Sequence, residues 1–189
     1  MPSDASAYLT GRLLVAMPGI EDSRFERSVI LVCAHDGRHA MGITINRPID
    51  GLTMAQLLKQ LEVEPAAGQA RDLVLMGGPL EPERGFVLHT DDYGSPGLRI
   101  GGGVSLTATR EILEALAGRV DRPRRAFMAL GYAGWDSGQL EREMRESVWL
   151  TCDADEGLLF DDDHEHKWSR ALAKIGVSAE HLSTMGGQA

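Results

Sequence analysis

Two β-branched runs joined by a short turn constrain this chain more than any other feature. Residues 28–34 read SVILVCA, residues 41–46 read MGITIN, and Asp36-Gly37 lies between them. An Asp-Gly pair can supply the positive φ angles of a tight hairpin turn. The first run is apolar on both faces, which is typical of a strand covered on both sides. The sequence therefore predicts a β-hairpin at the centre of a sheet, which does not fit a purely parallel βαβ fold.

Helical patterns alternate with short apolar runs along the rest of the chain. Thr53 can cap a helix over residues 54–62, with Gln56 reaching back to it and Pro65 stopping its continuation. The remaining patterns predict helices over residues 108–116, from Asp136 or Ser137 through Met144, and over 164–174, and strands over 73–76, 85–89, 126–130 and 148–152. We expect an α/β (α+β) chain, built as a layered αβα sandwich with a mixed sheet, the opening β-hairpin and room for a small α+β lobe. Residues 1–189 form a single domain in this interpretation.

The composition is acidic, with 19 Lys plus Arg against 28 Asp plus Glu and a net charge of −9. Such a charge repels nucleic acid and anionic membranes, so we expect neither direct nucleic-acid contact nor a membrane partner. No uncharged apolar run approaches the roughly 20 residues that span a bilayer. Cys33 and Cys152 are too few for a disulfide framework. We therefore expect a cytoplasmic location.

A glycine turn followed by a strand forms the first candidate site. Its residues are Gly77, Gly78, Pro79, Arg84, Gly85 and His89. Glycines let backbone amides approach an anion, Arg84 could clamp a carboxylate or phosphate, and His89 could titrate near neutral pH. The alternative is a turn that packs closely on the sheet, since glycine turns are common.

The densest local signal is GYAGWDSGQLE at residues 131–141, which predicts a strand, a glycine-rich corner and a capped helix. The candidate site residues here are Gly131, Tyr132, Gly134, Trp135, Asp136, Ser137 and Gln139. A helix N-terminus offers unpaired amides, so the corner could bind an anion or a small polar group. The alternative is a tight corner with Trp135 buried. Ser137 lies in no nucleophile-elbow pattern, so a serine hydrolase is not supported.

Other clusters favour structural interpretations. Gly101–Gly103 lacks the spacing of a phosphate cradle and predicts a bend or bulge. The DDDHEH run at 161–166 favours a solvated, capped helix entry over a metal site, because residues two apart on a helix do not face each other. Cys33 and His35 could hold a soft metal only with two further ligands. The basic cluster predicts a solvated loop and comprises Arg119, Arg122, Arg124 and Arg125. We predict no metal and no cofactor.

Several segments together resemble one known family. They are LLVAMP at 13–18, RSVILVCAHD at 27–36, MGITINRP at 41–48, GGPL with RGFVLH within 77–89, and GYAGWDSGQLE at 131–141. In this order they resemble the YqgE/AlgH proteins of bacteria, a family without an established biochemical function. The resemblance implies a layered α/β fold with a mixed sheet and supplies no reaction. Some members carry the label of transcriptional regulator, and with the acidic charge and no helix-turn-helix signature we expect any such effect here to be indirect.

The leading hypothesis is a cytoplasmic binding module whose pocket combines the 77–79 turn, Arg84, His89 and the 131–139 corner. It would bind a small anionic molecule or a protein segment. One alternative is an enzyme with His89 as acid or base, which requires His89 and Ser137 to lie within hydrogen-bond reach, near about 3 Å. Another alternative is an indirect transcriptional regulator.

Overall fold

The computed structural model describes residues 8–64, 72–94, 97–118 and 122–178, so Pro65 and Arg119 lie outside the described residues. The strands are β1 (Arg12–Ala16), β2 (Val29–His35), β3 (His39–Thr44), β4 (Pro48–Thr53), β5 (Leu73–Met76), β6 (Leu80–Thr90), β7 (Leu98–Gly101), β8 (Val104–Thr107), β9 (Ala126–Asp136) and β10 (Trp149–Asp153). The α-helices are α1 (Met54–Gln60), α2 (Arg110–Ala117), α3 (Gln139–Arg145), α4 (Glu156–Phe160) and α5 (Lys167–Lys174). Two 3₁₀ turns, η2 (Ser23–Phe25) and η3 (His164–His166), complete the elements.

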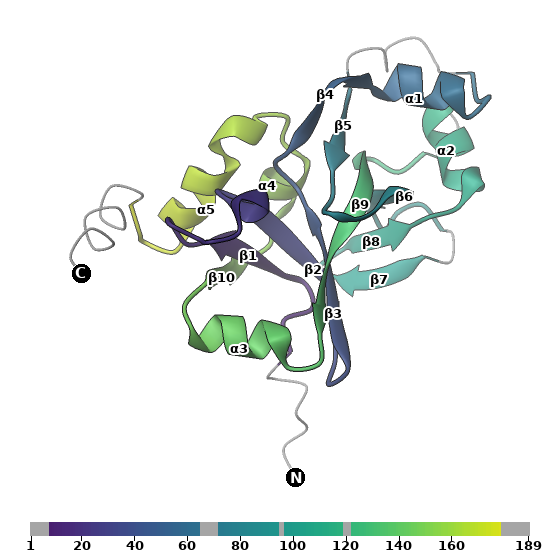
Figure 1. The fold of residues 1–189 in the computed structure, drawn as a ribbon. Coiled ribbons are helices and arrows are strands. Elements are labelled where there is room, and N and C mark those ends of the chain that lie inside the picture. The colour runs from purple at the N-terminus through teal and green to yellow at the C-terminus, as the bar shows by residue number, and fades with distance from the viewer. Residues whose placement is uncertain (1–7, 65–71, 95–96, 119–121, 179–189) are drawn as a thin grey trace.

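The strands form one mixed, curled sheet in which β9 is the central strand (Figure 1). The order along the sheet is β10-β1-β2-β3-β9-β6-β8-β7, while β5 pairs with both β4 and β9. Along one edge, β9 pairs with β5 and then with β3; along the other edge it pairs with β6 as far as Tyr132. Beyond Tyr132 no described strand covers that second edge. We call this stretch, Ala133–Asp136, the free edge of β9.

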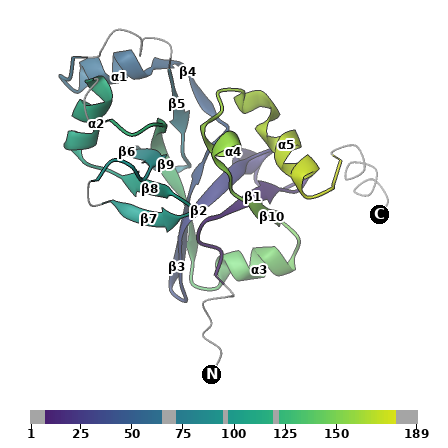
Figure 2. The ribbon, with the colours of Figure 1, turned by 180° about the vertical axis from the view of Figure 1, so that it is seen from behind.

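Three apolar clusters hold the helices on the sheet. The largest, which we call the inner cluster, packs Trp168 and Leu172 of α5 against Leu13 and Leu31 of the sheet. Because side chains alternate along a strand, the next residues face the opposite side. There, one cluster lies under α1 and α2 and another lies under α3. The helices thus cover a curled sheet at separate places (Figure 2), so the fold is α+β and the layered αβα sandwich is not confirmed.

The predicted hairpin is present as β2 and β3, and β2 is buried on both faces. Its turn closes differently from the prediction, because Gly37 does not have a positive φ. Instead the Asp36 carboxylate accepts hydrogen bonds from the backbone N–H groups of Arg38 and His39, at 2.8 and 3.1 Å. Such side-chain turns are a common alternative to a left-handed glycine.

The predicted first helix is confirmed together with its capping box. The Thr53 hydroxyl accepts from the Gln56 N–H, and the Gln56 side chain accepts from the Thr53 N–H. The helix after β9 begins later than predicted, at Gln139 with Gly138 as its N-cap. Asp136 does not cap it because Asp136 is still in the strand, and Ser137 does not because its hydroxyl donates to the Gly37 carbonyl at 2.9 Å.

The prediction of a strand over 126–130 ending at a glycine corner is wrong, since β9 continues through the corner to Asp136. Gly131 has a φ of +76° and acts as an irregularity within the strand. Before it, Ala129 faces the inner cluster; after it, Tyr132 faces that cluster and Ala133 faces the α3 side. One irregular residue therefore shifts the alternation of side chains, as a β-bulge does.

No helix in the described part of the chain is long and apolar enough to span a membrane. Cys33 and Cys152 are both unpaired and buried in the inner cluster. Burial raises the pKa of the Cys33 thiol to about 12, which fits a core residue.

Candidate functional site

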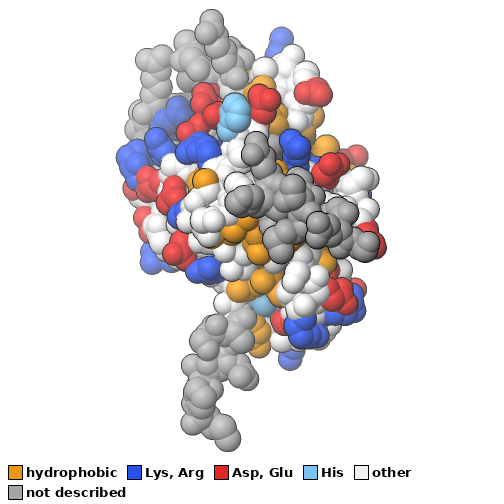
Figure 3. Space-filling view, turned by 90° about the vertical axis from the view of Figure 1, so that its left-hand side faces the viewer, with side chains coloured by type: hydrophobic (Ala, Val, Ile, Leu, Met, Phe, Trp, Pro, Cys, Tyr) orange, Lys and Arg blue, Asp and Glu red, His pale blue; other side chains and the backbone are white. Residues whose placement is uncertain are grey.

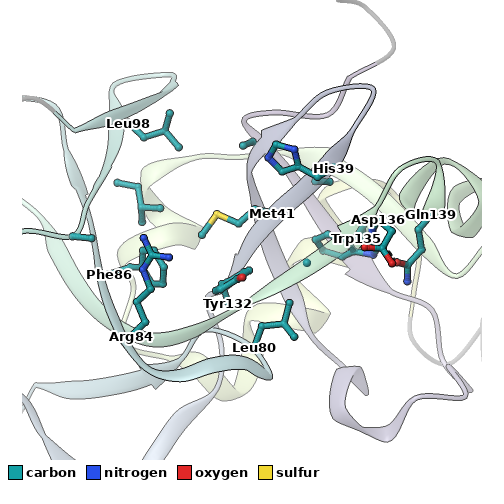
Figure 4. Close-up of a pocket in the computed structure, with 15 residues that line it drawn as sticks. His39, Met41, Leu80, Arg84, Phe86, Leu98, Tyr132, Trp135, Asp136 and Gln139 are labelled. Atoms are coloured by element: carbon teal, nitrogen blue, oxygen red, sulfur yellow. Dashed lines mark hydrogen bonds between the residues drawn. The ribbon is translucent and has the colours of Figure 1, made fainter.

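A groove of about 700 Å³ lies where β3, β6, β7, β8 and β9 meet (Figure 4). We call it the arginine groove. Its lining residues are Ala34, His39, Ala40, Met41, Leu80, Arg84, Phe86, Leu98, Leu106, Ala108, Tyr132, Gly134, Trp135, Asp136 and Gln139. Most of these are apolar or aromatic, and the charged members are few. This composition is typical of sites that hold an apolar ligand body and orient it by a small number of polar contacts.

The Arg84 guanidinium lies over the ring of Phe86, with its carbon 5.1 Å from the ring centroid. Phe86 in turn meets Tyr132 edge to face, at 6.0 Å between centroids. Arg84 and Phe86 are two residues apart on β6, so strand alternation points both side chains to the same face. Figure 4 shows these side chains near Met41, toward one end of the groove. The stacking holds the guanidinium over an apolar floor.

Glu81 is a weak ion-pair partner of the Arg84 guanidinium. Arg84 Nη1 and Glu81 Oε2 are 3.5 Å apart, and both side chains are more than half exposed. An exposed pair at this distance contributes little free energy. Glu81 also has a left-handed φ of +43°. The Tyr132 hydroxyl donates a hydrogen bond to the Glu81 carboxylate, which raises the pKa of Tyr132. Most of the Arg84 donors therefore stay open to a ligand, with a weak internal competitor beside them.

At the other end of the groove, the backbone and side chains of the 131–139 segment form a polar rim. The Asp136 N–H donates to Gln139 Oε1 at 3.0 Å. Gln139 Nε2 donates to Glu143 Oε2, also at 3.0 Å. His39 Nδ1 lies 3.4 Å from Asp36 Oδ1 across the hairpin turn. His39 thus has a carboxylate neighbour at this end, and Arg84 is the one Lys or Arg among the described residues that line the groove.

The structure brings together about half of the predicted site residues. Those that line the arginine groove are Arg84, Tyr132, Gly134, Trp135, Asp136 and Gln139. The predicted residues that do not line it are Gly77, Gly78, Pro79, Gly85, His89, Gly131 and Ser137. Pro79 lines a neighbouring groove, and Gly85 lies on the side of the sheet near α1 and α2.

Gly77, Gly78 and Gly131 have a packing role, because two backbones cross at these residues. A Cβ on Gly77 would lie 2.3 Å from the Gly131 carbonyl oxygen, and one on Gly78 would lie 2.1 Å from the Tyr132 carbonyl carbon. Real Cβ atoms do not approach backbone so closely, so side chains are excluded here. Close packing of the turn on the sheet therefore explains these glycines.

His89 does not belong to the pocket. It is 2% exposed, and its two ring nitrogens bond to the Thr90 carbonyl and the Thr107 hydroxyl. It pairs with Ala126 at the start of β9, whereas Ser137 follows the far end of that strand. His89 follows Arg84 by five residues on β6. Because this number is odd, the two side chains point to opposite faces of the strand. The geometric condition for His89 and Ser137 as a catalytic pair is therefore not met.

The apolar members of the groove were not predicted from the sequence. Phe86 could have been found from the alternation of Arg84 and Phe86 on one strand. Leu98 and Leu106 could not, because β7 and β8 were not predicted. Leu80 and Leu98 are 42% and 47% exposed, which is high for leucines beside a hollow.

A second hollow of about 600 Å³, the acidic groove, adjoins the first. It lies between residues 17–25, Pro79, Leu80, Gly134, and residues 139–149 of the α3 segment. Leu80, Gly134 and Gln139 line both grooves. Its carboxylates are Glu21, Asp22, Glu143 and Glu146, against the single cation Arg24 among its lining residues.

Charged residues of the 161–166 run and of the basic cluster form ion pairs within the protein. In the 161–166 run, Asp161 pairs with Arg170 and Asp163 pairs with His166. No group of three or more His, Cys, Asp or Glu that could hold a metal occurs among the described residues. Arg124 of the basic cluster pairs with Glu156 at 2.7 Å. Figure 3 shows acidic and basic side chains interspersed on one face of the molecule.

Comparison with known proteins gives consistent similarities. The family model described as AlgH-like matches residues 13–180. A UPF0301 protein of Caulobacter vibrioides is 61% identical over 188 residues, which cover 98% of this chain and 96% of the relative. A UPF0301 protein of Methylocella silvestris is 50% identical over 192 residues, covering 97% and 93%.

Two solved structures share the fold. The solution structure of the AlgH protein from Pseudomonas aeruginosa superposes with a TM-score of 0.77 at 37% identity, covering 100% of this chain and 96% of that one. A crystal structure of a protein from Corynebacterium diphtheriae gives a TM-score of 0.71 at 19% identity, covering 93% and 91%. The second similarity is one of fold alone.

Proposed function

The chain belongs to the AlgH-like family, and from this premise and the arginine groove we propose that it is a binding module for a ligand with an apolar body and an anionic group. The anionic group would bind Arg84, and the apolar body would lie against Met41, Phe86 and Leu98. The unpaired, buried thiols support a reducing compartment as its place of action, which we take to be the cytoplasm.

The observation that carries this proposal is the open guanidinium of Arg84 above an apolar floor. It is stacked on Phe86, is more than half exposed, and has among the described residues one weak carboxylate partner. Arginine is the side chain best suited to bind a carboxylate or phosphate with two parallel hydrogen bonds. The floor beneath it can exclude water, which strengthens such a contact.

Calorimetric titration with octanoate tests the proposal, because octanoate joins one carboxylate to an apolar chain. Octanamide, which has the same shape without the charge, is the matched ligand control. We expect octanoate to bind and Arg84→Gln to weaken it at least about tenfold, since hydrogen bonds to charged groups contribute roughly 1.5–3 kcal/mol. Arg99→Gln, which removes an exposed arginine outside the groove, should leave binding unchanged.

A second variant of the same site should change the octanoate affinity in the opposite direction. Glu81→Gln removes the internal competitor of Arg84, so octanoate should bind several-fold more tightly. The proposal is wrong if octanoate does not bind the wild-type protein, or if Arg84→Gln and Glu81→Gln change its affinity in the same direction.

A further inference from the structure

The free edge of β9 exposes backbone groups between the two grooves. The Asp136 N–H donates to Gln139 Oε1, so it points away from β3. Backbone groups alternate in direction along a strand of an antiparallel pair, so the N–H and C=O of Gly134 also point away from β3. Gly134 is half-buried, and it lines both grooves. An unpaired strand edge of this kind is a template for another strand.

At this edge the Arg84 end of the arginine groove lies on the face of the inner cluster, whereas the acidic groove lies on the α3 side. Ala40 and Trp135 of the α3-side cluster also line the arginine groove. In the arginine groove, Met41 and Tyr132 pack on the inner cluster. In the acidic groove, Phe25 and Trp149 belong to the cluster on the α3 side. A strand added at the free edge would point successive side chains alternately to these two faces. The edge therefore offers two different chemical environments to one extended segment.

The acidic groove holds a carboxylate in a fixed position. Glu143 Oε1 accepts from the indole N–H groups of Trp135 and Trp149, at 3.3 and 3.0 Å, and Oε2 accepts from Gln139. All three donors are neutral, and no ion pair joins Glu143 to a described Lys, Arg or His. Arg24 is engaged with Asp22 at 2.7 Å. The groove thus presents unbalanced negative charge, opposite in sign to the Arg84 end.

Building on the proposed function, we infer that the free edge of β9 binds an extended segment of a partner protein by strand addition. The segment presents an acidic side chain to Arg84 and the neighbouring basic side chains to the acidic groove. Each groove alone has the volume of a small-molecule site, so a ligand that fills both grooves must be larger than a typical small molecule. Main-chain hydrogen bonds to Gly134 supply affinity, and the two faces supply specificity.

Two blocked pentapeptides of the same composition test the charge pattern, acetyl-LKEKL-amide and the rearranged acetyl-KLELK-amide. Each reads the same in both directions, so strand orientation does not affect the comparison. LKEKL places leucine and glutamate on the Arg84 face and lysine on the acidic face. In KLELK the lysines and the glutamate share one face in every register. We expect LKEKL to bind at least about tenfold more tightly than KLELK, because only LKEKL can place glutamate and lysine on opposite faces. Glu146→Gln should weaken LKEKL binding, whereas Glu111→Gln on α2 should not.

Backbone methylation separates strand addition from side-chain binding alone. Residues directly opposite in a hydrogen-bonded pair point their side chains to the same face. For a segment added antiparallel to β9, the N–H of the central glutamate therefore faces β9, and the N–H groups of the lysines face away. N-methylation of the glutamate should weaken LKEKL at least about tenfold, while N-methylation of one lysine should leave binding within about twofold.

The possible failures are distinguishable. If octanoate binds through Arg84 but LKEKL binds no better than KLELK, the proposed function stands and strand addition is wrong. Equal effects of the two methylations also overturn strand addition. If the protein forms a dimer in sedimentation velocity that LKEKL dissociates, a second copy of the chain occupies the edge, and a partner segment is not its occupant.

Discussion

Gly131 shows how one residue can set the geometry of a site. Its φ of +76° shifts the alternation of β9, which turns Tyr132 and Gly134 toward the arginine groove. Its missing side chain also allows the chain to cross Gly78, since a Cβ would lie 2.4 Å from the Gly78 carbonyl oxygen. The sequence marks this glycine but cannot say which of these demands applies, because the contact joins residues far apart in the chain.

Gly131→Ala should therefore be strongly destabilising. Gly138 has the same φ of +76°, and a Cβ on it would meet nothing within 4 Å, so Gly138→Ala serves as a matched control for the backbone strain. We expect Gly138→Ala to cost about 1–2 kcal/mol from the left-handed backbone alone. Gly131→Ala should cost more than about 3 kcal/mol, measured by urea unfolding. Equal losses would show that the crossing with Gly78 is not tight.

Lys167 is fully buried and fixes α5 to its neighbours. Its ammonium donates to the carbonyls of Ile45 and Leu159, at 2.9 and 3.2 Å. Burial lowers the pKa of Lys167 from 10.5 to about 8. Between these values the unfolded chain binds more protons than the folded one, so stability must rise with pH in that window.

Comparison with Lys167→Met isolates this effect, since methionine does not titrate. Relative to the variant, the unfolding free energy of the wild type should increase from about pH 8 to pH 10, by at most about 1.4 kcal/mol per pH unit. Denaturant unfolding at several pH values measures the difference. Parallel curves for the two proteins would mean that the pKa of Lys167 is not lowered by burial.

At the scale of elements, the patterns with clear local signals were predictable and the long-range pairings were not. The capping box of α1 and the β2–β3 hairpin depend on residues a few positions apart, and both are present. The full length of β9 depends on pairing with distant segments. The β7–β8 hairpin was not predicted although its two strands are close in the chain, and β8 pairs in turn with the more distant β6. The prediction ended β9 at Gly131 because glycine is a common terminator, whereas the pairing with β3 extends it.

The capping box gives an element-scale prediction with an internal control. Thr53→Ala removes the side-chain hydrogen bond to the Gln56 N–H and should cost about 1 kcal/mol of unfolding free energy. Thr109 occupies the same position at α2 but makes no side-chain cap bond. Thr109→Ala should therefore have little effect. A similar loss for both variants in urea unfolding would contradict the assignment of the box.

At the scale of the whole molecule, the arginine groove exists because the sheet curls around β9. The pairing of Leu80 with Tyr132 brings the β6 arginine beside the 131–139 segment, and β7 and β8 add the apolar wall. The sequence indicated both polar halves of this site, since each carries a dense motif. It placed His89 wrongly, although strand alternation from Arg84 was enough to exclude that residue. The leucines of the wall carry no motif and emerge from the fold alone.

The most direct test of this groove as a binding site is to map where octanoate contacts the protein by NMR. We predict that octanoate, but not octanamide, shifts the side-chain Nε–H signal of Arg84, together with the backbone amides of Tyr132 and Gly134. The shifts should saturate at the affinity measured by calorimetry. Shifts that cluster away from the arginine groove, or an Arg84 signal that does not move, would contradict its role as the binding site.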